Sequence, residues 1–377
     1  MLLIIQKIKL IHITKKKLQL LFKKFGYRLF KLIYPKINEF ENIKQNISSN
    51  ITLSKINKDF TYNVFIINNA RLYTDTVSDC AVIQNNKVLE GPSFQIRDTK
   101  FENIKKNNIF IKGTPKIKKK VKGKVLSLLT GGAGNYNYWH WLFDVLPRIK
   151  IAQNVLNIDD IDYFLFPNVS KKFQKETINF LNIPLKKCLS SINFRHFECN
   201  QLIVTNHPYV INNEPTSEIQ NLPEWIIIWL QNTFMQKNQL EDLKFPDKIF
   251  IDRADASPNV IQRREIINNE EVKKTAISNG YKVLNLSEHH FSDQIKYFYN
   301  AKKIFGLHGA GFANIIFSKP GTNFLELRSN TAGKVCENLA KKCQLNYSCI
   351  SNTPQKNIEN NQMGSIEIDV NELKKRL

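Results

Sequence analysis

The second half of this 377-residue chain alternates short apolar runs with helical patterns. We expect strands at residues 248–252, 281–286, 304–307 and 323–327, and helices at 269–279, 292–301 and 312–317. Acidic residues Glu270 and Glu271 at the start of the first helix and Gly280 at its end match the polarity of helix caps and dipoles. Because each strand is followed by a helix, the pattern predicts a parallel sheet with helices on both faces.

The first half shows a similar alternation. We expect strands at 64–67, 125–129, 163–166 and 202–205, and helices at 138–153, 171–181 and 222–234. The chain is therefore predicted to be α/β, with two doubly wound domains that bind ligands at the carboxyl ends of their strands and between the domains. We place a basic extension at residues 1–45 and the two domains at 46–237 and 238–377, because a polar stretch at 236–241 separates the halves.

The charge is strongly positive: 55 Lys+Arg against 33 Asp+Glu give +22. Residues 1–38 hold ten basic residues, and no acidic residue precedes Glu39. Apolar residues alternate with them at helical spacing, which predicts a basic amphipathic helix that lies either on an anionic membrane surface or on the protein's own core. No apolar stretch is long enough to span a bilayer.

Two further features indicate what the chain binds. Nine lysines lie between residues 105 and 124, a run that a nucleic-acid-binding protein could use as a phosphate stripe. Asp160 and Asp162 have the D-x-D spacing of metal-dependent transferases, but they stand in a polar turn before a strand, so we expect no metal there. The six cysteines form no C-x-x-C pair, which predicts free thiols in a reducing cytosol.

A glycine-rich turn follows the strand at 304–307 and consists of His308, Gly309, Ala310 and Gly311. Backbone N–H groups and a helix start converge there, which suits a diphosphate, since glycine permits close approach and positive φ. The alternative is a tight turn whose glycines serve packing alone. His308 is predicted either to bond a phosphate oxygen or to be a structural histidine, and Glu326, inside the next strand, either to bind ribose hydroxyls or to contact solvent at a sheet edge. Arginine side chains suit a diphosphate, which makes candidates of Arg253, Arg263 and Arg264; the alternative for Arg263-Arg264 is a solvated pair at a helix start.

A second motif occupies residues 138–148. His140 and Asp144 are four residues apart, so one helical face brings an imidazole and a carboxylate together for acid–base chemistry. Tyr138, Trp139 and Trp141 are predicted to stack on sugar rings, or alternatively to belong to the core.

These motifs together resemble the family 61 glycosyltransferases. The resemblance covers about residues 125–330 and includes Tyr-x-His-Trp-Leu-Phe-Asp-x-Leu-Pro-Arg at 138–148, Asp252-Arg253, Arg263-Arg264, Gln294, the turn at 308–311 with Asn314, Pro320-Gly321-Thr322 and Glu326. One departure is Asp252, where the family has serine. The resemblance implies a GT-B fold, two Rossmann-like domains facing a cleft, and metal-independent, inverting transfer from a UDP-sugar without any other cofactor.

The resemblance and the chemistry together assign roles to these residues. Asp144 is predicted to be the base, with His140 as its rival or its orienting partner, and acceptor contacts come from Tyr138, Trp139, Trp141 and Arg148. The donor is predicted to contact Arg253, Arg263, Arg264, Gln294, His308, Gly309, Ala310, Gly311, Asn314 and Glu326. We expect a cytoplasmic enzyme of surface-polysaccharide synthesis, peripheral on the inner face of the membrane, acting on a glycan or lipid-linked acceptor. The alternatives are a nucleic-acid-binding protein and an inactive scaffold.

Overall fold

The structure is a computed structural model of the chain, and it describes residues 2–37, 39–42, 51–76, 79–97, 100–129, 136–236, 240–242, 244–253, 264–354 and 364–377, with side chains from residue 17 onward. The chain divides into two compact units. The N-terminal unit comprises Met1–Gly132, Ala152–Pro167 and Leu189–Asn206, and the C-terminal unit comprises Ala133–Ile151, Asn168–Cys188 and His207–Leu377. The units interleave along the chain, whereas the predicted domains are contiguous; the divisions at 45/46 and 237/238 stay a prediction.

The C-terminal unit contains the parallel sheet that the sequence predicts. Its strands are β12 (Lys248–Asp252), β13 (Lys282–Asn285), β14 (Lys303–Leu307), β15 (Asn323–Ser329) and β16 (Asn346–Asn352), in the order β13-β12-β14-β15-β16. This is the order of one common doubly wound fold, and the strand order reverses between β12 and β14. Loops at the carboxyl ends of those two strands are therefore the expected ligand position.

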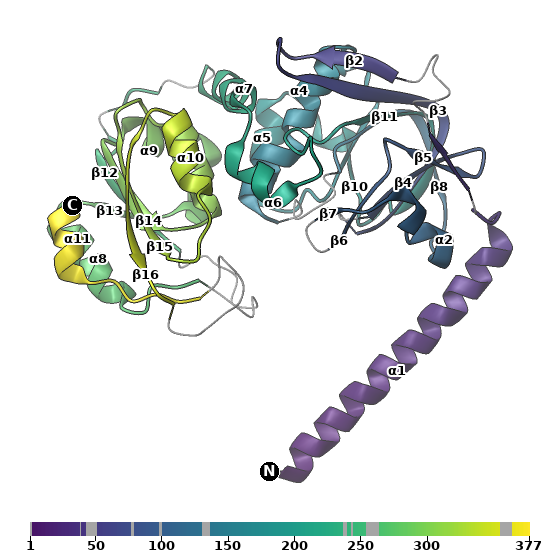
Figure 1. The fold of residues 1–377 in the computed structure, drawn as a ribbon, viewed down its shortest axis with the longest axis horizontal. Coiled ribbons are helices and arrows are strands. Elements are labelled where there is room, and N and C mark those ends of the chain that lie inside the picture. Colours follow the sequence, from purple (N-terminus) through teal and green to yellow (C-terminus); the bar gives the residue numbers. More distant parts are fainter. Residues whose placement is uncertain are drawn as a thin grey trace. The chain divides into compact units, whose positions relative to one another are not determined.

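Helices cover both faces of this sheet (Figure 1). On one face, α8 (Asn269–Ser278) and α11 (Val370–Arg376) contribute Val272, Ala276 and Leu373 to an apolar core with β12, β14 and β15. On the other face lie α9 (Phe291–Asn300), α10 (Val335–Lys342) and the 3₁₀ helix η7 (Ala310–Phe317). Burying apolar residues on both faces is the arrangement that fixes a doubly wound sheet.

The same unit includes shorter helices from the middle of the chain. These are α3 (Tyr138–His140), a single π-helical turn η2 (Trp141–Val145), α4 (Pro147–Gln153), α5 (Lys172–Phe180), η4 (Leu185–Lys187), α6 (Pro215–Glu218), η5 (Ile219–Asn221), α7 (Glu224–Met235) and η6 (Leu286–Glu288). The helices predicted at 138–153, 171–181 and 222–234 are thus confirmed, with the π turn interrupting the first.

The sheet of the N-terminal unit is mixed, so the prediction of a doubly wound parallel sheet in the first half is wrong. Its order is β1-β5-β4-β3-β11-β8-β9-β10. In addition, β2 pairs with β3, β6 pairs with β4, and β7 pairs with β6. The strands are β1 (Glu39–Asn42), β2 (Ile51–Lys55), β3 (Thr61–Thr76), β4 (Asp79–Gln84), β5 (Lys87–Glu90), β6 (Phe94–Arg97), β7 (Lys100–Phe101), β8 (Lys119–Ser127), β9 (Tyr163–Phe166), β10 (Cys188–Ser190) and β11 (His196–Thr205). The pairs β8–β9 and β8–β11 are parallel, whereas β3 pairs antiparallel with β2, β4 and β11.

Short turns explain the antiparallel half. Asn85 and Asn86 connect β4 to β5 with φ of 49° and 60°, the left-handed conformation that a two-residue hairpin requires. Three short helices complete this unit: η1 (Ile104–Lys106), α2 (Ile109–Lys112) and η3 (Ile158–Asp160).

The chain begins with a long helix, α1 (Leu2–Ile33) (Figure 1). Among its described side chains, seven apolar ones lie along one face and are 44–86% exposed: Leu18, Leu21, Phe22, Phe25, Leu29, Leu32 and Ile33. We call this set the apolar stripe. Tyr34, directly after the helix, accepts a hydrogen bond from Lys118 N and packs on His196, which ties the end of α1 to the sheet. Within the described residues, no helix has the length and apolar character needed to cross a membrane.

Candidate active site

A cavity of about 280 Å³ opens at the carboxyl ends of β12 and β14, where the strand order reverses. Arg253 follows β12 and lines the cavity together with Arg264. Asp252 also lines it, and its carboxylate is engaged by Lys273 Nζ at 2.9 Å and Asn269 Nδ2 at 3.3 Å. Lys273 therefore neutralises the negative charge of Asp252, the residue that departs from the family motif, and the positive charge of the two arginines remains. Arg263 lies outside the described residues.

The two arginines form a cationic pair. Arg253 Nη1 donates a hydrogen bond to the His308 carbonyl oxygen at 2.7 Å. Burial and the neighbouring Arg253 charge lower the pKa of Arg264 to about 10, so it is still a cation at neutral pH. Among the residues that the structure describes, Arg264 Nη1 is buried without a hydrogen-bond partner. A buried guanidinium N–H beside a second arginine is suited to an anion with several oxygens, such as a diphosphate.

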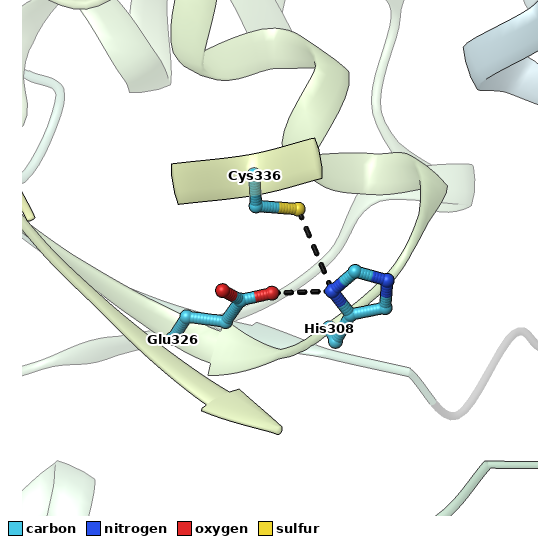
Figure 2. A group of neighbouring side chains, drawn as sticks. All are labelled: His308, Glu326 and Cys336. Atoms are coloured by element: carbon cyan, nitrogen blue, oxygen red, sulfur yellow. Dashed lines mark hydrogen bonds and ion pairs between the residues drawn. The ribbon is translucent and has the colours of Figure 1, made fainter. Parts of the chain in front are cut away.

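His308, directly after β14, and Glu326, in the middle of β15, form a buried pair (Figure 2). His308 Nδ1 bonds Glu326 Oε1, and Tyr347 Oη donates to Glu326 Oε2 at 2.6 Å. Burial would raise the pKa of Glu326, but the bonds from His308 and Tyr347 lower it overall, so the carboxylate is ionised. Burial lowers the pKa of His308. The imidazole is thus neutral, with its proton on Nδ1.

This bond determines which ring nitrogen of His308 is left without a proton. Since Nδ1 carries the proton toward Glu326, Nε2 of His308 carries a lone pair and accepts hydrogen bonds. Figure 2 shows Nε2 on the side of the ring away from Glu326 and Cys336. The pair therefore presents an acceptor, which suits a hydroxyl group and not an anionic phosphate oxygen.

The same place brings together three possible metal-ligating atoms, from His308, Glu326 and Cys336, all within 4.8 Å of one another. Cys336 Sγ lies 3.6 Å from His308 Nδ1, and burial raises the pKa of the thiol well above its usual range. Arg328 Nη1 lies 3.8 Å from Glu326 Oε2. A protonated thiol, a carboxylate already bonded on both oxygens and a nearby guanidinium fit a hydrogen-bonded network better than a cation site.

The glycines of the turn serve packing, so the interpretation that they permit positive φ is wrong. Gly309 has φ 172°, an extended conformation open to any residue. A Cβ on Gly309 would collide with the Arg253 guanidinium, and a Cβ on Gly306 would lie 2.7 Å from the Ile251 carbonyl oxygen. A Cβ on Gly311 would lie 2.9 Å from Leu286 Cδ1. Gly309 thus lets Arg253 lie against the turn, and η7 starts directly afterwards at Ala310.

The His140–Asp144 pair predicted from the sequence is confirmed as a contact. The Asn137 side chain caps α3 by accepting from Trp139 N at 2.9 Å and His140 N at 3.4 Å. Across the first turn and the π turn, His140 Nδ1 lies 2.8 Å from Asp144 Oδ2. The Asp144 side chain is 3% exposed, whereas that of His140 is 20% exposed. The imidazole is therefore the part of the pair that solvent reaches.

Neighbours of Asp144 set its protonation. His207 Nε2 lies 3.8 Å from Asp144 Oδ2, and His207 Nδ1 accepts from Tyr209 N at 3.3 Å, so the proton of this second histidine is on Nε2. Burial would raise the pKa of Asp144, yet His140 and His207 hold it well below its usual range. Burial would lower the pKa of His140, and the Asp144 charge and hydrogen bond more than offset this and raise it.

The remaining predicted residues lie inside the fold. Trp139 and Trp141 are buried, and Trp141 Nε1 donates to Thr177 Oγ1 at 2.8 Å, which favours the core interpretation over sugar stacking. Arg148 is buried as well. Tyr138, Gln294 and Asn314 are hydrogen-bonded to one another. Contacts of all these residues with substrate stay a prediction.

Sequence reasoning missed four residues of the site: His207, Tyr209, Cys336 and Tyr347. His207 lies two residues after the end of the strand predicted at 202–205, a position at which polar residues of α/β proteins commonly face a ligand. That signal was sufficient to nominate it. Cys336 and Tyr347 carry no such signal, because they lie on a helix and on a polar strand beyond the predicted ones.

The D-x-D aspartates have a structural explanation. Asp162 Oδ2 accepts the Lys124 N–H at 2.7 Å and lies beside Gly123, whose φ is +116°. Asp160 ends the 3₁₀ helix η3. Asp162 thus holds the β8 backbone, and the expectation that no metal binds there stays a prediction.

Comparison with known proteins identifies the chain. Residues 138–325 match the family model described as Glycosyltransferase 61. No curated protein sequence matches the chain. The matched segment contains the His140–Asp144 pair, both described arginines of the cavity and the turn at His308. The resemblance noted in the sequence is confirmed: the chain belongs to glycosyltransferase family 61 and is a glycosyltransferase.

Proposed function

We propose that this glycosyltransferase moves a sugar from a nucleoside diphosphate donor, a UDP-sugar, to a hydroxyl of a glycan or lipid-linked acceptor, with inversion and without a metal. The observation that carries the donor class is the Arg253–Arg264 pair at the carboxyl edge of the sheet. The two guanidinium groups supply positive charge, and Arg264 Nη1 has no hydrogen-bond partner among the described residues, so a diphosphate that accepts from it is stabilised there.

The reaction needs one base and one anion-stabilising group. The base takes the proton of the acceptor hydroxyl, the acceptor oxygen bonds to the anomeric carbon, and the bond from that carbon to the diphosphate oxygen breaks. The electron pair leaves with the diphosphate, and Arg253 and Arg264 stabilise its charge. Because the attack is direct, the configuration inverts and no covalent enzyme intermediate forms.

We assign the base to His140 and its orientation to Asp144, a revision of the predicted order of roles. Asp144 is nearly inaccessible and its pKa is held well below the usual range, so it accepts a proton poorly. His140 is reachable and its pKa is raised, so it is the stronger base. A buried carboxylate that fixes the tautomer of a histidine base is the arrangement of the serine protease triad.

On the donor side, we assign His308 Nε2 to a hydroxyl of the donor nucleotide sugar and Glu326 to the orientation of His308. Glu326 is fully buried and both its oxygens are bonded within the protein. This supports an indirect role in place of the direct ribose contact expected from the sequence.

The protein is further proposed to act on the inner face of the membrane, in surface-polysaccharide synthesis. The support is α1, whose apolar stripe is exposed and flanked by Lys17, Lys24, Arg28 and Lys31, an arrangement that suits an anionic bilayer surface. The nucleic-acid alternative loses support because lysines of the second basic run are paired with acids, for instance Lys118 and Lys120 with Glu198.

A donor screen tests the proposal. Purified full-length protein is incubated with single nucleotide sugars, and UDP release and thermal stabilisation are measured with and without excess EDTA. We expect UDP and one or more UDP-sugars to stabilise the protein, and turnover to survive EDTA. Stabilisation by nucleic acid but by no nucleotide would refute the proposal in favour of a nucleic-acid-binding protein, and UDP binding without turnover for any donor and acceptor tried would support an inactive scaffold.

A further inference from the structure

Tyr138, Asn314 and Gln294 form a continuous chain of hydrogen bonds inside the C-terminal unit. Tyr138 Oη lies 2.5 Å from Asn314 Oδ1, and Asn314 Nδ2 lies 3.0 Å from Gln294 Oε1. Gln294 Nε2 then bonds the carbonyl oxygens of Leu286 at 2.8 Å and His289 at 3.3 Å. Asn314 and Gln294 are buried, so water does not replace these bonds.

The two carbonyl oxygens that Gln294 bonds determine which group donates and which accepts in every hydrogen bond of the chain. Carbonyl oxygens only accept, so the Gln294 amide nitrogen donates to them and its Oε1 faces Asn314. Asn314 must then donate through Nδ2, which turns its Oδ1 toward Tyr138. The tyrosine hydroxyl consequently donates, and burial raises its pKa well above the usual range, so it keeps its proton. Only one arrangement of the amides satisfies all three side chains.

This chain joins the two parts of the proposed active site. Tyr138 is the first residue of α3, two positions before His140. Asn314 lies in η7, the helix that begins directly after His308 and Gly309. Gln294 lies on α9, which packs beside η7. One hydrogen bond, from Tyr138 to Asn314, therefore crosses from the segment with the base to the segment of the donor turn.

We propose that Tyr138, through Asn314 and Gln294, is a positioning residue that sets the distance between the base on α3 and the donor turn. It does not touch the reacting atoms. Its hydroxyl determines where His140 stands relative to the anomeric carbon of the bound donor. The inference rests on the proposed function, since it concerns how well transfer is aligned once donor and acceptor are bound.

The test is Tyr138→Phe in the full-length protein, with Tyr281→Phe as the matched control. Tyr281 is a buried tyrosine of the same unit whose hydroxyl bonds the Leu377 carbonyl oxygen at 3.5 Å, and it belongs to neither motif. Four quantities are compared: the melting temperature, the UDP dissociation constant, the rate of sugar transfer and the rate of donor hydrolysis by water. Hydrolysis needs the donor site but not the aligned acceptor base.

We expect Tyr138→Phe to lower kcat for transfer about 10- to 100-fold, the effect of misplacing a reacting group by about 1 Å. The UDP affinity and donor hydrolysis should stay at the wild-type level, and Tyr281→Phe should leave all rates unchanged. Equal transfer in the two variants would overturn the inference, as would a parallel loss of transfer, hydrolysis and UDP affinity in Tyr138→Phe, which indicates general destabilisation. Absence of UDP binding and turnover in the wild type would instead refute the proposed function itself.

Discussion

The assignment of His140 as base and Asp144 as its orienting partner is tested by Asp144→Asn. The carboxylate bonds His140 Nδ1 at 2.8 Å and carries the charge that raises the pKa of the imidazole. Replacing it with an amide removes a charged hydrogen bond, worth about 1.5–3 kcal/mol or about 10- to 150-fold in rate. An amide can also donate to Nδ1 and select the wrong tautomer, an effect of about 10⁴-fold in the serine protease triad. We therefore expect transfer to fall about 10²- to 10⁴-fold.

The pH dependence of kcat/KM distinguishes the two possible bases. If His140 is the base, it must be unprotonated, and since its pKa is raised above the ordinary value of about 6.5, activity falls as the pH drops below neutrality. In Asp144→Asn the loss of the negative charge lowers the pKa of His140, so the residual activity falls off at lower pH than in the wild type. The pair titrates as a unit, so the inflection belongs to both groups together.

The assay is a pH series of UDP release at subsaturating donor, with UDP affinity measured in parallel. Asp247→Asn, at an exposed carboxylate, is the matched control and should leave rate and profile unchanged. A wild-type profile that stays flat down to about pH 4 would show that His140 is not the base, because only Asp144 has a pKa low enough to remain ionised there. Full activity of Asp144→Asn would refute a role for this carboxylate altogether.

Further predictions concern binding. Arg264→Met should weaken UDP binding about 10- to 100-fold, as measured by calorimetry. The melting temperature of the free protein should rise, because the repulsion between Arg264 and Arg253 is removed. An unchanged UDP affinity would contradict the diphosphate site. Gly309→Ala should displace Arg253 and weaken UDP binding in the same assay, and a wild-type affinity would show that the guanidinium is not needed there. In α1, Phe25→Asp should reduce flotation with anionic liposomes, whereas Leu20→Asp, equally exposed but outside the apolar stripe, should reduce it much less; equal losses would argue against docking through the stripe.

The alternation of apolar runs and helices was enough to predict the parallel sheet from β12 to β15. It did not reveal β16, because Asn346–Asn352 is a polar edge strand in which only Ile350 is buried. In the first half the same reasoning failed, because an apolar run does not indicate whether the adjacent strand pairs with it in parallel or antiparallel orientation. The Asn85-Asn86 turn is a hairpin signal, but β3 pairs with β11 across more than a hundred residues, and that partner follows from the fold as a whole.

The site divides in the same way. Contacts within one helical segment were predictable, and His140–Asp144 is one of them. The His308–Glu326 pair was not, although each residue was singled out, because it depends on β14 lying next to β15 with Leu307 opposite Leu327. The prediction gave each residue a direct contact with the donor. The register places the two side chains in contact, and this contact supports the proposal that Glu326 orients His308 and that His308, not Glu326, contacts the donor.

These protonation states define a pH range in which donor binding and the transfer step are expected to depend on pH differently. Arg264, with a pKa of about 10, stays charged below pH 9, and His308, with a lowered pKa, stays neutral above about pH 6.5. The diphosphate of a sugar nucleotide is a diester and has no proton to exchange there. Neither Arg264 nor His308 therefore changes its charge between pH 6.5 and 8, whereas the pKa of His140 is raised above its ordinary value. A change in transfer rate at constant affinity for the intact sugar nucleotide within this range accordingly reports the His140–Asp144 pair and not the donor site.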